Sequence, residues 1–341
     1  MVYIDEKQLR KEFDSAHNPV YLFDDDADGL CSFLQVYRHI KDGKGIIVKT
    51  TPRITEQFVG KCQDHTPDKI FVLDIATVDQ EFIDKVKIPV VWVDHHGPVE
   101  RNNIKYHNSR IQYDNNIPTS MLCYNALKKD LWIAMAGIVA DWQLPRELAK
   151  EFSEKYPKLL PADIKKPEDA MFTTEIGRLG KILGFNLKGN IKEVMKSIKV
   201  LTRINDPFEI LNGLTPQGKF ILKKYEKIDR VYTEILDGAS GSKPDGKFLI
   251  YKYFDNKMSV TKEVSNETLY RNPDKIVIIG RVKSDEVKMS IRSRDYNVRE
   301  LLGKALQGVE GFGGGHEHAC GAVVKEDDFE DFIENFKREV E

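Results

Sequence analysis

The sequence has few cysteines, no long apolar run and almost no net charge, and each absence excludes a class of protein. Its four cysteines, Cys31, Cys62, Cys123 and Cys320, are scattered and form no Cys-x-x-Cys pair. This argues against a disulfide framework or a thiolate zinc site and favours a reducing cytoplasm. No apolar stretch approaches the ~20 residues that cross a bilayer, which excludes a membrane-spanning protein. The first seven residues have no apolar core or small-residue cleavage site, so we expect no secretion signal.

The net charge is −2, from 52 basic and 54 acidic residues, so the whole chain does not indicate a polyanionic partner. Basic residues nevertheless gather in two stretches. Eleven basic and five acidic residues lie between Lys181 and Arg230, and nine basic and five acidic residues lie between Arg271 and Lys304. Solvated helix faces explain such runs, and a positive surface that attracts a phosphate-bearing substrate explains them equally well.

The length of 341 residues, with 41% hydrophobic and 31% charged, predicts a globular protein of two or three domains. Near the N-terminus, short apolar runs alternate with helical patterns such as the one at about 30–41. Continuous apolar strands separated by helices are typical of a parallel sheet covered on both faces, an α/β fold. The predicted strands occupy residues 19–24, 45–49, 69–74 and 88–94.

The rest of the chain predicts a helical region and a second, smaller α/β domain. Residues 117–237 are mostly helical in pattern, and the Gly/Ser/Pro-rich stretch 239–246 predicts a turn or linker. Beyond it we expect a glycine-rich loop at 308–315, strands at 247–253, 275–282, 286–292 and near 322–324, and helices at 298–306 and from 327. The predicted domains are a parallel-sheet domain at 1–144, a helical connector at 145–239 and the second α/β domain at 240–341.

The densest chemical signal is the run from Asp24 to Gly29, which holds four carboxylates in five positions at the end of a predicted strand. Like charges this close repel one another unless a cation compensates, and a hard divalent ion with oxygen ligands is the natural one. An EF-hand calcium loop would need a Glu six residues after the glycine, where this chain has Gln35. A solvated acidic turn remains the alternative interpretation of the cluster alone.

Three of the four predicted strands end on an aspartate, namely Asp24, Asp74 and Asp94. In open parallel sheets the ligand site lies beyond the carboxyl ends of the strands, so we expect these side chains to converge. His95 and His96 follow Asp94 directly. Such a mixed carboxylate and imidazole set suits Mn²⁺, with Mg²⁺ as the oxygen-preferring alternative, and suits Zn²⁺ less well without thiolates.

These motifs, with one more in this half and two in the C-terminal half, resemble those of the DHH phosphoesterases. The N-terminal motifs are Asp24-x-Asp26-x-Asp28-Gly29, Asp74, Asp94-His95-His96 and Gly137-Ile138-x-x-Asp141. The C-terminal ones, Met289-Ser290-Ile291-Arg292-Ser293-Arg294 and Gly313-Gly314-Gly315-His316-x-x-Ala319-x-Gly321, resemble the substrate-binding domain that accompanies the DHH domain. The resemblance spans residues 18 to 325. Its departures are Cys320, where Ala is common, and a helical region longer than in the shortest members.

The resemblance implies a centre of two Mn²⁺ or Mg²⁺ ions in the first domain and a substrate-binding second domain across a cleft. The implied metal ligands are Asp24, Asp26, Asp28, Asp74, His95 and Asp141. It places His96 against the scissile phosphate or the metal shell, and Asp94 as the residue that orients a neighbouring histidine, so that Asp94, His95 and His96 form the catalytic group. The substrate-binding residues are His96, Arg292, Ser293, Arg294, Gly314, Gly315 and His316, of which Arg292 offers a forked guanidinium.

The family includes RecJ-like exonucleases, oligoribonucleotide phosphodiesterases, nucleotide bisphosphate phosphatases and cyclic dinucleotide phosphodiesterases. We expect a metal-dependent exonuclease that removes nucleotides from an end of single-stranded DNA or RNA, or of short oligonucleotides. A small-molecule nucleotide phosphatase or cyclic dinucleotide phosphodiesterase is the alternative. A catalytically silent, replication-associated scaffold is disfavoured because the motif residues are all retained. Cleavage polarity, DNA or RNA preference, protein partners and a homodimer are left open.

Stacking on aromatic side chains would accompany a channel that holds bases. The second domain offers Tyr251, Tyr253, Phe254, Tyr296 and Phe312. Aromatic residues in alternating strands are more often part of the core, so the sequence singles out none of them.

Overall fold

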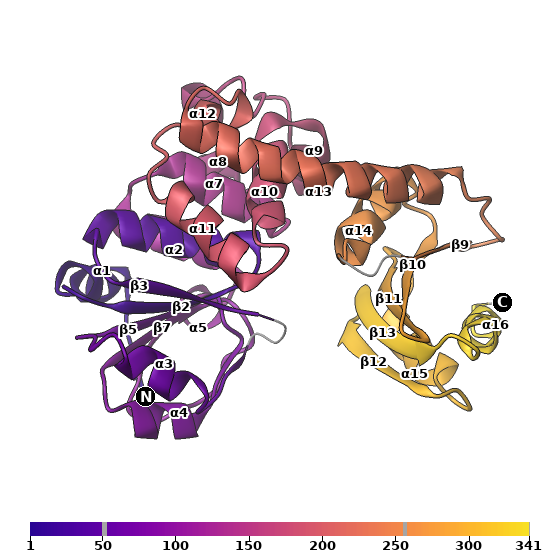
Figure 1. Ribbon diagram of the computed structural model, residues 1–341, viewed down its shortest axis with the longest axis horizontal. Helices are drawn as coiled ribbons and strands as arrows, with labels where there is room; N and C mark the ends of the chain where they lie inside the picture. Colours follow the sequence, from indigo (N-terminus) through magenta and orange to yellow (C-terminus); the bar gives the residue numbers. More distant parts are fainter. Residues whose placement is uncertain (50–52, 255–257, 341) are drawn as a thin grey trace. The chain divides into compact units, whose positions relative to one another are not determined.

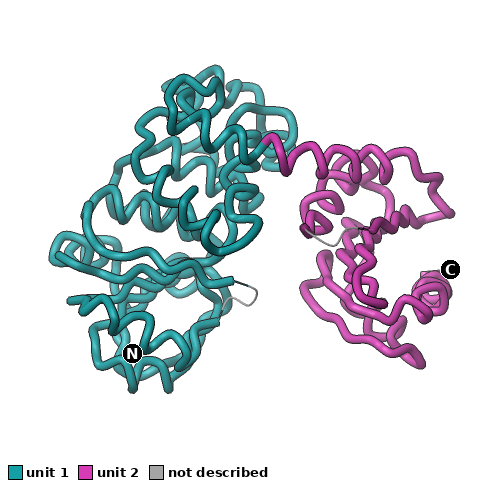
Figure 2. Tube along the Cα trace, in the orientation of Figure 1, with its two compact units in different colours: residues 1–225 teal, residues 226–341 magenta. Residues whose placement is uncertain are grey.

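A computed structural model describes residues 1–49, 53–254 and 258–340 (Figure 1). The chain divides into two compact units, Met1–Tyr225 and Glu226–Glu341 (Figure 2). The predicted fold class, an α/β parallel-sheet domain followed by a helical region and a second sheet domain, is confirmed. Among the described residues, no helix combines the length and apolar character needed to span a membrane.

Unit 1 is built on a six-stranded sheet in the order β1-β8-β7-β5-β2-β3, in which every neighbouring pair is parallel. The four predicted strands are present as its continuous centre and one edge. Two short strands, β1 and β8, extend the other edge; they are polar or very short and carry no readable pattern. The strands are β1 (Val2–Tyr3), β2 (Val20–Asp24), β3 (Lys44–Val48), β5 (Ile70–Leu73), β7 (Val90–Asp94) and β8 (Lys105–Asn108), and a separate two-stranded pair is β4 (Arg53–Ile54) with β6 (Thr77–Val78).

Helices cover both faces of this sheet (Figure 1). On one face, aromatic rings from helices and strands stack together, as in Phe23 with Phe33, whose ring centroids lie 4.5 Å apart. The other face packs against α3 and α4 through a second core, in which Phe82, Trp92 and Tyr106 lie among aliphatic side chains. Burial of both faces explains why the strands read as continuous apolar runs. The helices are α1 (Glu6–Asp14), α2 (Ala27–Ile40), α3 (Phe58–Gln63), α4 (Gln80–Val86), α5 (Ser109–Tyr113), α6 (Thr119–Leu127) and α7 (Leu131–Ala140).

The predicted helical region follows, and its last helix runs from unit 1 into unit 2 (Figure 2). This helix continues to Gly241, so the start of the expected linker at 239–246 is helical instead. Its buried residues Tyr232 and Ala239 explain why it persists into the small-residue stretch. The helices are α8 (Arg146–Lys155), α9 (Pro167–Thr173), α10 (Glu175–Asn186), α11 (Ile191–Leu201), α12 (Pro207–Leu211) and α13 (Pro216–Gly241).

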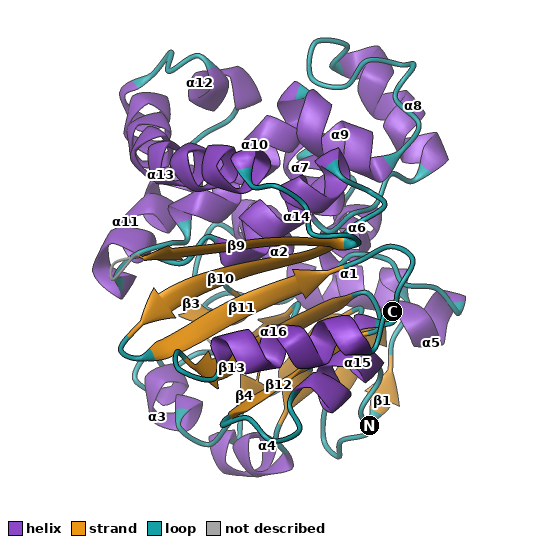
Figure 3. Cartoon of the chain, turned by 90° about the vertical axis from the view of Figure 1, so that its right-hand side faces the viewer, coloured by secondary structure: helices purple, strands orange, loops and turns teal. Residues whose placement is uncertain are grey.

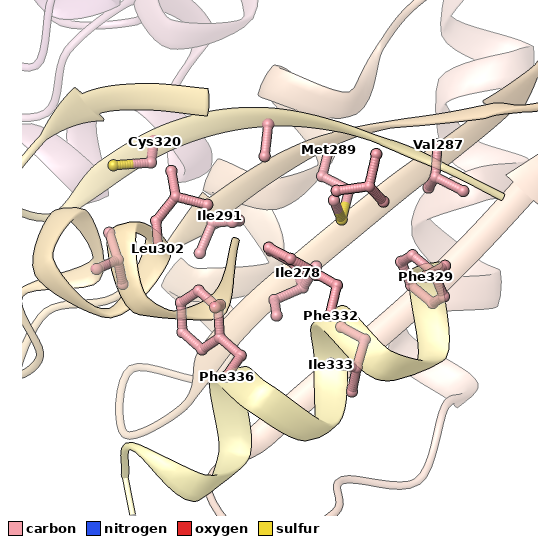
Figure 4. Packing of buried hydrophobic residues seen from close by; sticks show 14 of the residues in the cluster. Ile278, Val287, Met289, Ile291, Leu302, Cys320, Phe329, Phe332, Ile333 and Phe336 are labelled. Atoms are coloured by element: carbon pink, nitrogen blue, oxygen red, sulfur yellow. The ribbon is translucent and has the colours of Figure 1, made fainter. Parts of the chain in front are cut away.

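Unit 2 holds a five-stranded sheet in the order β12-β13-β11-β10-β9, antiparallel except between β9 and β10. Figure 3 shows α15 and α16 lying over one face, and Figure 4 shows their side chains, including Leu302, Phe332 and Phe336, packed among Ile278 and Ile291 of the strands. Its elements are β9 (Phe248–Phe254), α14 (Thr261–Arg271), β10 (Ile276–Lys283), β11 (Glu286–Arg292), α15 (Val298–Ala305), β12 (Gly311–His316), β13 (Ala319–Lys325) and α16 (Phe329–Arg338).

The expectation of a glycine-rich loop at 308–315 is wrong, because most of this stretch is the edge strand β12. β12 pairs antiparallel with β13 from Gly311 to His316. Glycine is needed for close approach: a Cβ on Gly315, where φ is +148°, would lie 2.4 Å from the carbonyl oxygen of Ala319. The glycines therefore allow a tight hairpin rather than marking an irregular loop.

Candidate metal centre

The acidic run joins the end of β2 to the start of α2. Asp26 caps the helix, and its carboxylate accepts hydrogen bonds from the backbone N–H of Asp28 at 3.0 Å and of Gly29 at 3.1 Å. A Cβ on Gly29 would lie 2.8 Å from the backbone nitrogen and oxygen of Asp24. Only glycine lets the first helical turn lie against the strand end this closely, which keeps the carboxylates of the run together at the sheet edge.

Asp28 is buried and held by the start of α6. Its carboxylate accepts hydrogen bonds from the backbone N–H of Thr119 at 2.7 Å and of Ser120 at 3.0 Å, and from the Ser120 hydroxyl. Sequence reasoning missed both residues. A Thr-Ser pair lies directly after Pro118 and before an apolar run, which indicates the start of a helix. The first N–H groups of a helix have no acceptor within the helix, so this pair could have been predicted to donate to a carboxylate.

Asp74 follows β5 in a left-handed backbone conformation, with φ of +61°. Non-glycine residues rarely adopt it, and aspartate is among those that do. Its carboxylate accepts a hydrogen bond from Thr119 Oγ1 at 3.1 Å, and one of its oxygens lies 3.2 Å from Nε2 of His95. The backbone turn thus aims the strand-end carboxylate at the histidine that follows β7.

His95 contacts Asn116 and a second carboxylate, Asp141, through its other ring nitrogen. Nδ1 lies 2.8 Å from Oδ1 of Asn116 and 3.8 Å from Oδ2 of Asp141, the residue that ends α7. The side chain of Arg110 donates a hydrogen bond to the backbone carbonyl of His95 at 2.9 Å. Asn116 and Arg110, neither predicted, therefore orient a ring that touches both Asp74 and Asp141.

His96 is paired with Asp94 rather than with the acidic run. Its Nδ1 lies 2.7 Å from Oδ1 of Asp94, and its backbone N–H donates to Oδ2 at 3.1 Å. Asp94 is fully buried, and Tyr106 and Asn108 of β8 donate hydrogen bonds to it, each at 3.4 Å. The Asp94 carboxylate thus fixes the orientation of the His96 ring through Nδ1, and this interaction does not use Nε2.

The carboxylates of this cluster carry more negative charge than the protein compensates. Burial, followed by the effect of Asp28, raises the pKa of Asp74 well above its usual value, and burial likewise raises the pKa of Asp28. Burial and Asp28 raise the pKa of Asp141 to about 7. Burial alone would lower the pKa of His95, but its contacts with Asp74 raise it to about 11. A bound cation is the group that would relieve this excess.

Three overlapping sets of side chains could hold metal ions, and within each set the ligand atoms lie within 4.8 Å of one another. Asp74 belongs to two of the sets and His95 to two, so the sets form one continuous donor surface of carboxylate oxygens and imidazole nitrogens. This chemistry fits one or more divalent ions of the Mn²⁺ or Mg²⁺ type. The sets are Asp74, His95 and His96; Asp28, His95 and Asp141; and Asp24, Asp26 and Asp74.

In unit 2 the predicted substrate residues lie around the β12–β13–β11 part of the sheet. Arg292 and His316 both pair with Ala319 of the intervening strand, so they share one row. Arg292 is fixed by the protein: Nε donates to Oδ1 of Asn266 at 2.7 Å, and Nη1 donates to the carbonyls of Ile291 and Cys320 at 2.9 and 3.0 Å. Burial lowers the pKa of Arg292 to about 10, so it stays charged at neutral pH.

The remaining predicted residues are arranged differently from one another. Ser293 is buried, and its Oγ accepts a hydrogen bond from the backbone N–H of Tyr296, whereas Arg294 is exposed. Gly314 has open space where a Cβ would project, but Gly315 faces Cys320 on the side of the core. Of this set, Arg292, His316 and Gly314 therefore share one face of the strands, which is exposed at Gly314 and His316 and partly covered by α14 at Arg292.

Two family profiles match the chain. The one described as DHH family, N-terminal domain, matches residues 20–160, and the one described as DHHA1 domain matches residues 245–341. The chain belongs to the DHH family of phosphoesterases. The resemblance inferred from the motifs is thereby confirmed.

Solved structures of DHH proteins share the fold at low sequence identity. RecJ from Thermus thermophilus in complex with Mn²⁺ is 17% identical, with a TM-score of 0.68 over 98% of this chain, which spans 53% of the RecJ chain. An exonuclease RecJ bound to manganese is 15% identical, with a TM-score of 0.64 over 98% of this chain and 94% of its own. A pGpG-specific phosphodiesterase from Vibrio cholerae is 15% identical, with a TM-score of 0.50 over 93% of this chain and 96% of its own. A search of curated proteins finds no match.

Proposed function

We propose that this DHH protein is a metal-dependent phosphodiesterase that removes nucleotides from an end of single-stranded nucleic acid or short oligonucleotides. The observation that carries the proposal is the sharing of Asp74 and His95 between overlapping donor sets. A carboxylate such as Asp74, which lies in two of the sets, is the kind of ligand that two closely spaced ions would share. The Thermus RecJ structures in complex with Mn²⁺ and with Mg²⁺ support a divalent ion of this kind.

The ligands would be Asp24, Asp26, Asp28, Asp74, His95 and Asp141. When bound, two divalent ions would polarise the phosphate, lower the pKa of an attacking water and neutralise the leaving oxygen. The protein's own residues prepare the site for this chemistry. Thr119 and Ser120 hold the carboxylates of Asp28 and Asp74 in place, so little reorganisation is needed at the moment of reaction.

His96 would donate from Nε2 to a phosphate oxygen. Its pairing with Asp94 supports this role, because the carboxylate stabilises the protonated ring and raises the pKa of His96 against the effect of burial. A charged donor becomes more useful as negative charge develops on the phosphate. Asp94 is thus a positioning residue, buried where it contacts the histidine but not the substrate.

Unit 2 would hold the end of the substrate. The paired row of Arg292 and His316 offers a charged guanidinium and an exposed imidazole to a terminal phosphate. Arg292 is preorganised by its bonds to Asn266 and to backbone carbonyls, which reduces the entropy that binding would cost.

The test is product analysis with Mn²⁺ on end-labelled DNA and RNA oligomers of several lengths, alongside cyclic dinucleotides and nucleotide bisphosphates. Asp74→Asn, which keeps the side-chain shape but removes a shared ligand charge, is the inactive control. Successive loss of terminal nucleotides supports the proposal. Cleavage of only the small nucleotides would instead support the alternative phosphatase or cyclic dinucleotide phosphodiesterase, and no hydrolysis by a metal-loaded protein would support a silent scaffold.

A further inference from the structure

The five aromatic residues of unit 2 that the sequence offered for base stacking differ in how far they are buried. Tyr253 is buried, Tyr296 packs against the core, and Tyr251 contacts α13 at the position where a Cβ on Gly238 would project. Phe254 and Phe312 are exposed, with 75% and 70% of their surface accessible. Single exposed apolar residues are common on protein surfaces, so the neighbours on the same strand face decide what each ring could bind.

Only one of these two exposed rings shares a face with the predicted phosphate-binding residues. On β12, a Cβ on Gly313 would contact Leu302 of α15, so Gly313 faces the core. Side chains alternate along a strand, and Phe312 therefore lies on the opposite face, together with His316. On β9, Phe248 and Ile250 pack in the core beneath α16, which places Phe254 on that same core side, away from His316.

The strand register arranges this open face in rows. In one row Arg292 and His316 flank Ala319; in another, four residues further along β13, Lys288 and Phe312 flank Val323. Four residues of a strand span about 13 Å, and the two flanking strands are about 10 Å apart.

Between these rows, Gly314 and Gly321 are exposed and pair with each other. A Cβ on Gly314 would meet nothing within 4 Å, and one on Gly321 would meet only a backbone oxygen at 3.6 Å. On β12 and β13 the floor between the two rows is therefore bare backbone that a sugar-phosphate chain can cross, and on β11 the intervening residue is the buried Ser290.

We propose that Phe312 and Lys288 form a second nucleotide subsite, in which the ring stacks on a base and the ammonium group contacts the next phosphate. The inference rests on the proposed function, since it assumes a terminal phosphate at Arg292 and His316. Lys288 is exposed on this face, and its Nζ lies 3.5 Å from Oε2 of Glu286, two residues earlier on the same strand. An aromatic ring beside a cation is the usual means of holding a single strand without reading its sequence. The consequence is that the site accepts substrates of at least two nucleotides.

The experiment measures binding to the full-length chain in an Asp74→Asn background with Mn²⁺ present. The probes are a nucleoside monophosphate, a dinucleotide and a five-nucleotide single strand. Phe312→Ala should weaken binding of the two longer probes about 5- to 150-fold, the range of one base stack, and should leave the monophosphate unchanged. Phe254→Ala is the matched control, another exposed phenylalanine in a strand, and should change none of the three.

A second variant separates stacking from a general effect on the fold. Phe312→Trp should restore affinity, and its added fluorescence should be quenched by the oligonucleotides but not by the monophosphate. Removing in turn each base of the five-nucleotide strand should identify one position at which Phe312→Ala has no further effect. Lys288→Gln should reduce the slope of log affinity against log salt by about 0.7, the value of one single-strand phosphate contact.

Two results would overturn the inference in different ways. If the wild-type protein cleaves oligonucleotides and the Asp74→Asn protein binds them, but Phe312→Ala binds them normally or loses the monophosphate to the same degree, the second subsite is wrong and the proposed function stands. If the wild-type protein does not cleave oligonucleotides and the Asp74→Asn protein does not bind them, the proposed function fails and the subsite fails with it.

Discussion

The uncompensated carboxylates predict that Asp141, a proposed metal ligand, destabilises the metal-free protein. Asp141 lies at the end of α7 with 25% of its side chain exposed, and burial together with Asp28 raises its pKa from 3.8 to about 7. The folded state therefore keeps the proton up to about pH 7, whereas the unfolded chain releases it near pH 3.8. Raising the pH through this window removes stability, by about 4 kcal/mol at pH 8 for a shift of roughly three pH units.

Asp141→Asn removes this penalty without changing the shape of the side chain. In metal-free protein at pH 8 we expect a gain of about 2–4 kcal/mol, the lower value allowing for imperfect hydrogen bonds of the buried amide. For a unit of this size that corresponds to an increase in Tm of about 4–16 °C. At pH 4, where Asp141 is protonated in the folded state, the gain should fall to about 0.5 kcal/mol.

Thermal melting followed by circular dichroism, at pH 4 and pH 8, with chelator and with Mn²⁺, measures each of these quantities. Added Mn²⁺ should raise the Tm of the wild type more than that of Asp141→Asn, and the variant should lose hydrolysis. Asp163→Asn makes the same chemical change at an exposed site outside the cluster and should alter Tm at neither pH. An equal gain at both pH values, or an equal response of both proteins to Mn²⁺, would refute the reasoning.

Three further outcomes are expected. Excess chelator should abolish hydrolysis, and Mn²⁺ should restore it at least as well as Mg²⁺; full activity in chelator would contradict the metal centre. Arg292→Ala or His316→Ala should raise KM or Kd for substrate while Mn²⁺ affinity, measured by calorimetry, stays unchanged, and loss of metal by either variant would show that unit 2 residues support the centre. The slope of log affinity against log salt, measured with Asp74→Asn, should steepen with oligomer length until the binding surface is filled, whereas a slope that is shallow at every length would favour a small-molecule substrate.

The candidate metal centre shows most clearly which features the sequence predicts and which only the tertiary structure decides. The strand-end positions of Asp24, Asp74 and Asp94 were predictable because buried parallel strands read as apolar runs and because their carboxyl ends meet at one edge. That Asp74 and His95 touch, at 3.2 Å, and that each belongs to two donor sets could not be read from spacing. Their roles as metal ligands stay a prediction.

The residues that hold the carboxylates escaped sequence reasoning for a physical reason. Thr119 and Ser120 lie more than ninety positions from Asp28, yet they donate three hydrogen bonds to it, and Asn116 contacts His95 from the same segment. Long-range hydrogen bonds leave no periodic pattern in a sequence. Only the packing of α6 against α2 brings these donors to the acidic run.

In unit 2 the sequence alone predicted neither the strand β12 nor the exposed position of Phe312. Composition predicted a loop from the glycines before His316, but glycine serves both irregular turns and closely approaching strands, and pairing with β13 selected the strand. Phe312 lies within that predicted loop, so alternation assigned it to no strand face, and burial statistics favoured the core for the aromatic residues of unit 2 as a group. The sequence by itself determined the family, the α/β fold and the chemistry of the acidic edge. The register of β12, β13 and β11 decided which face Phe312 occupies, because a shift of one residue would have turned it into the core.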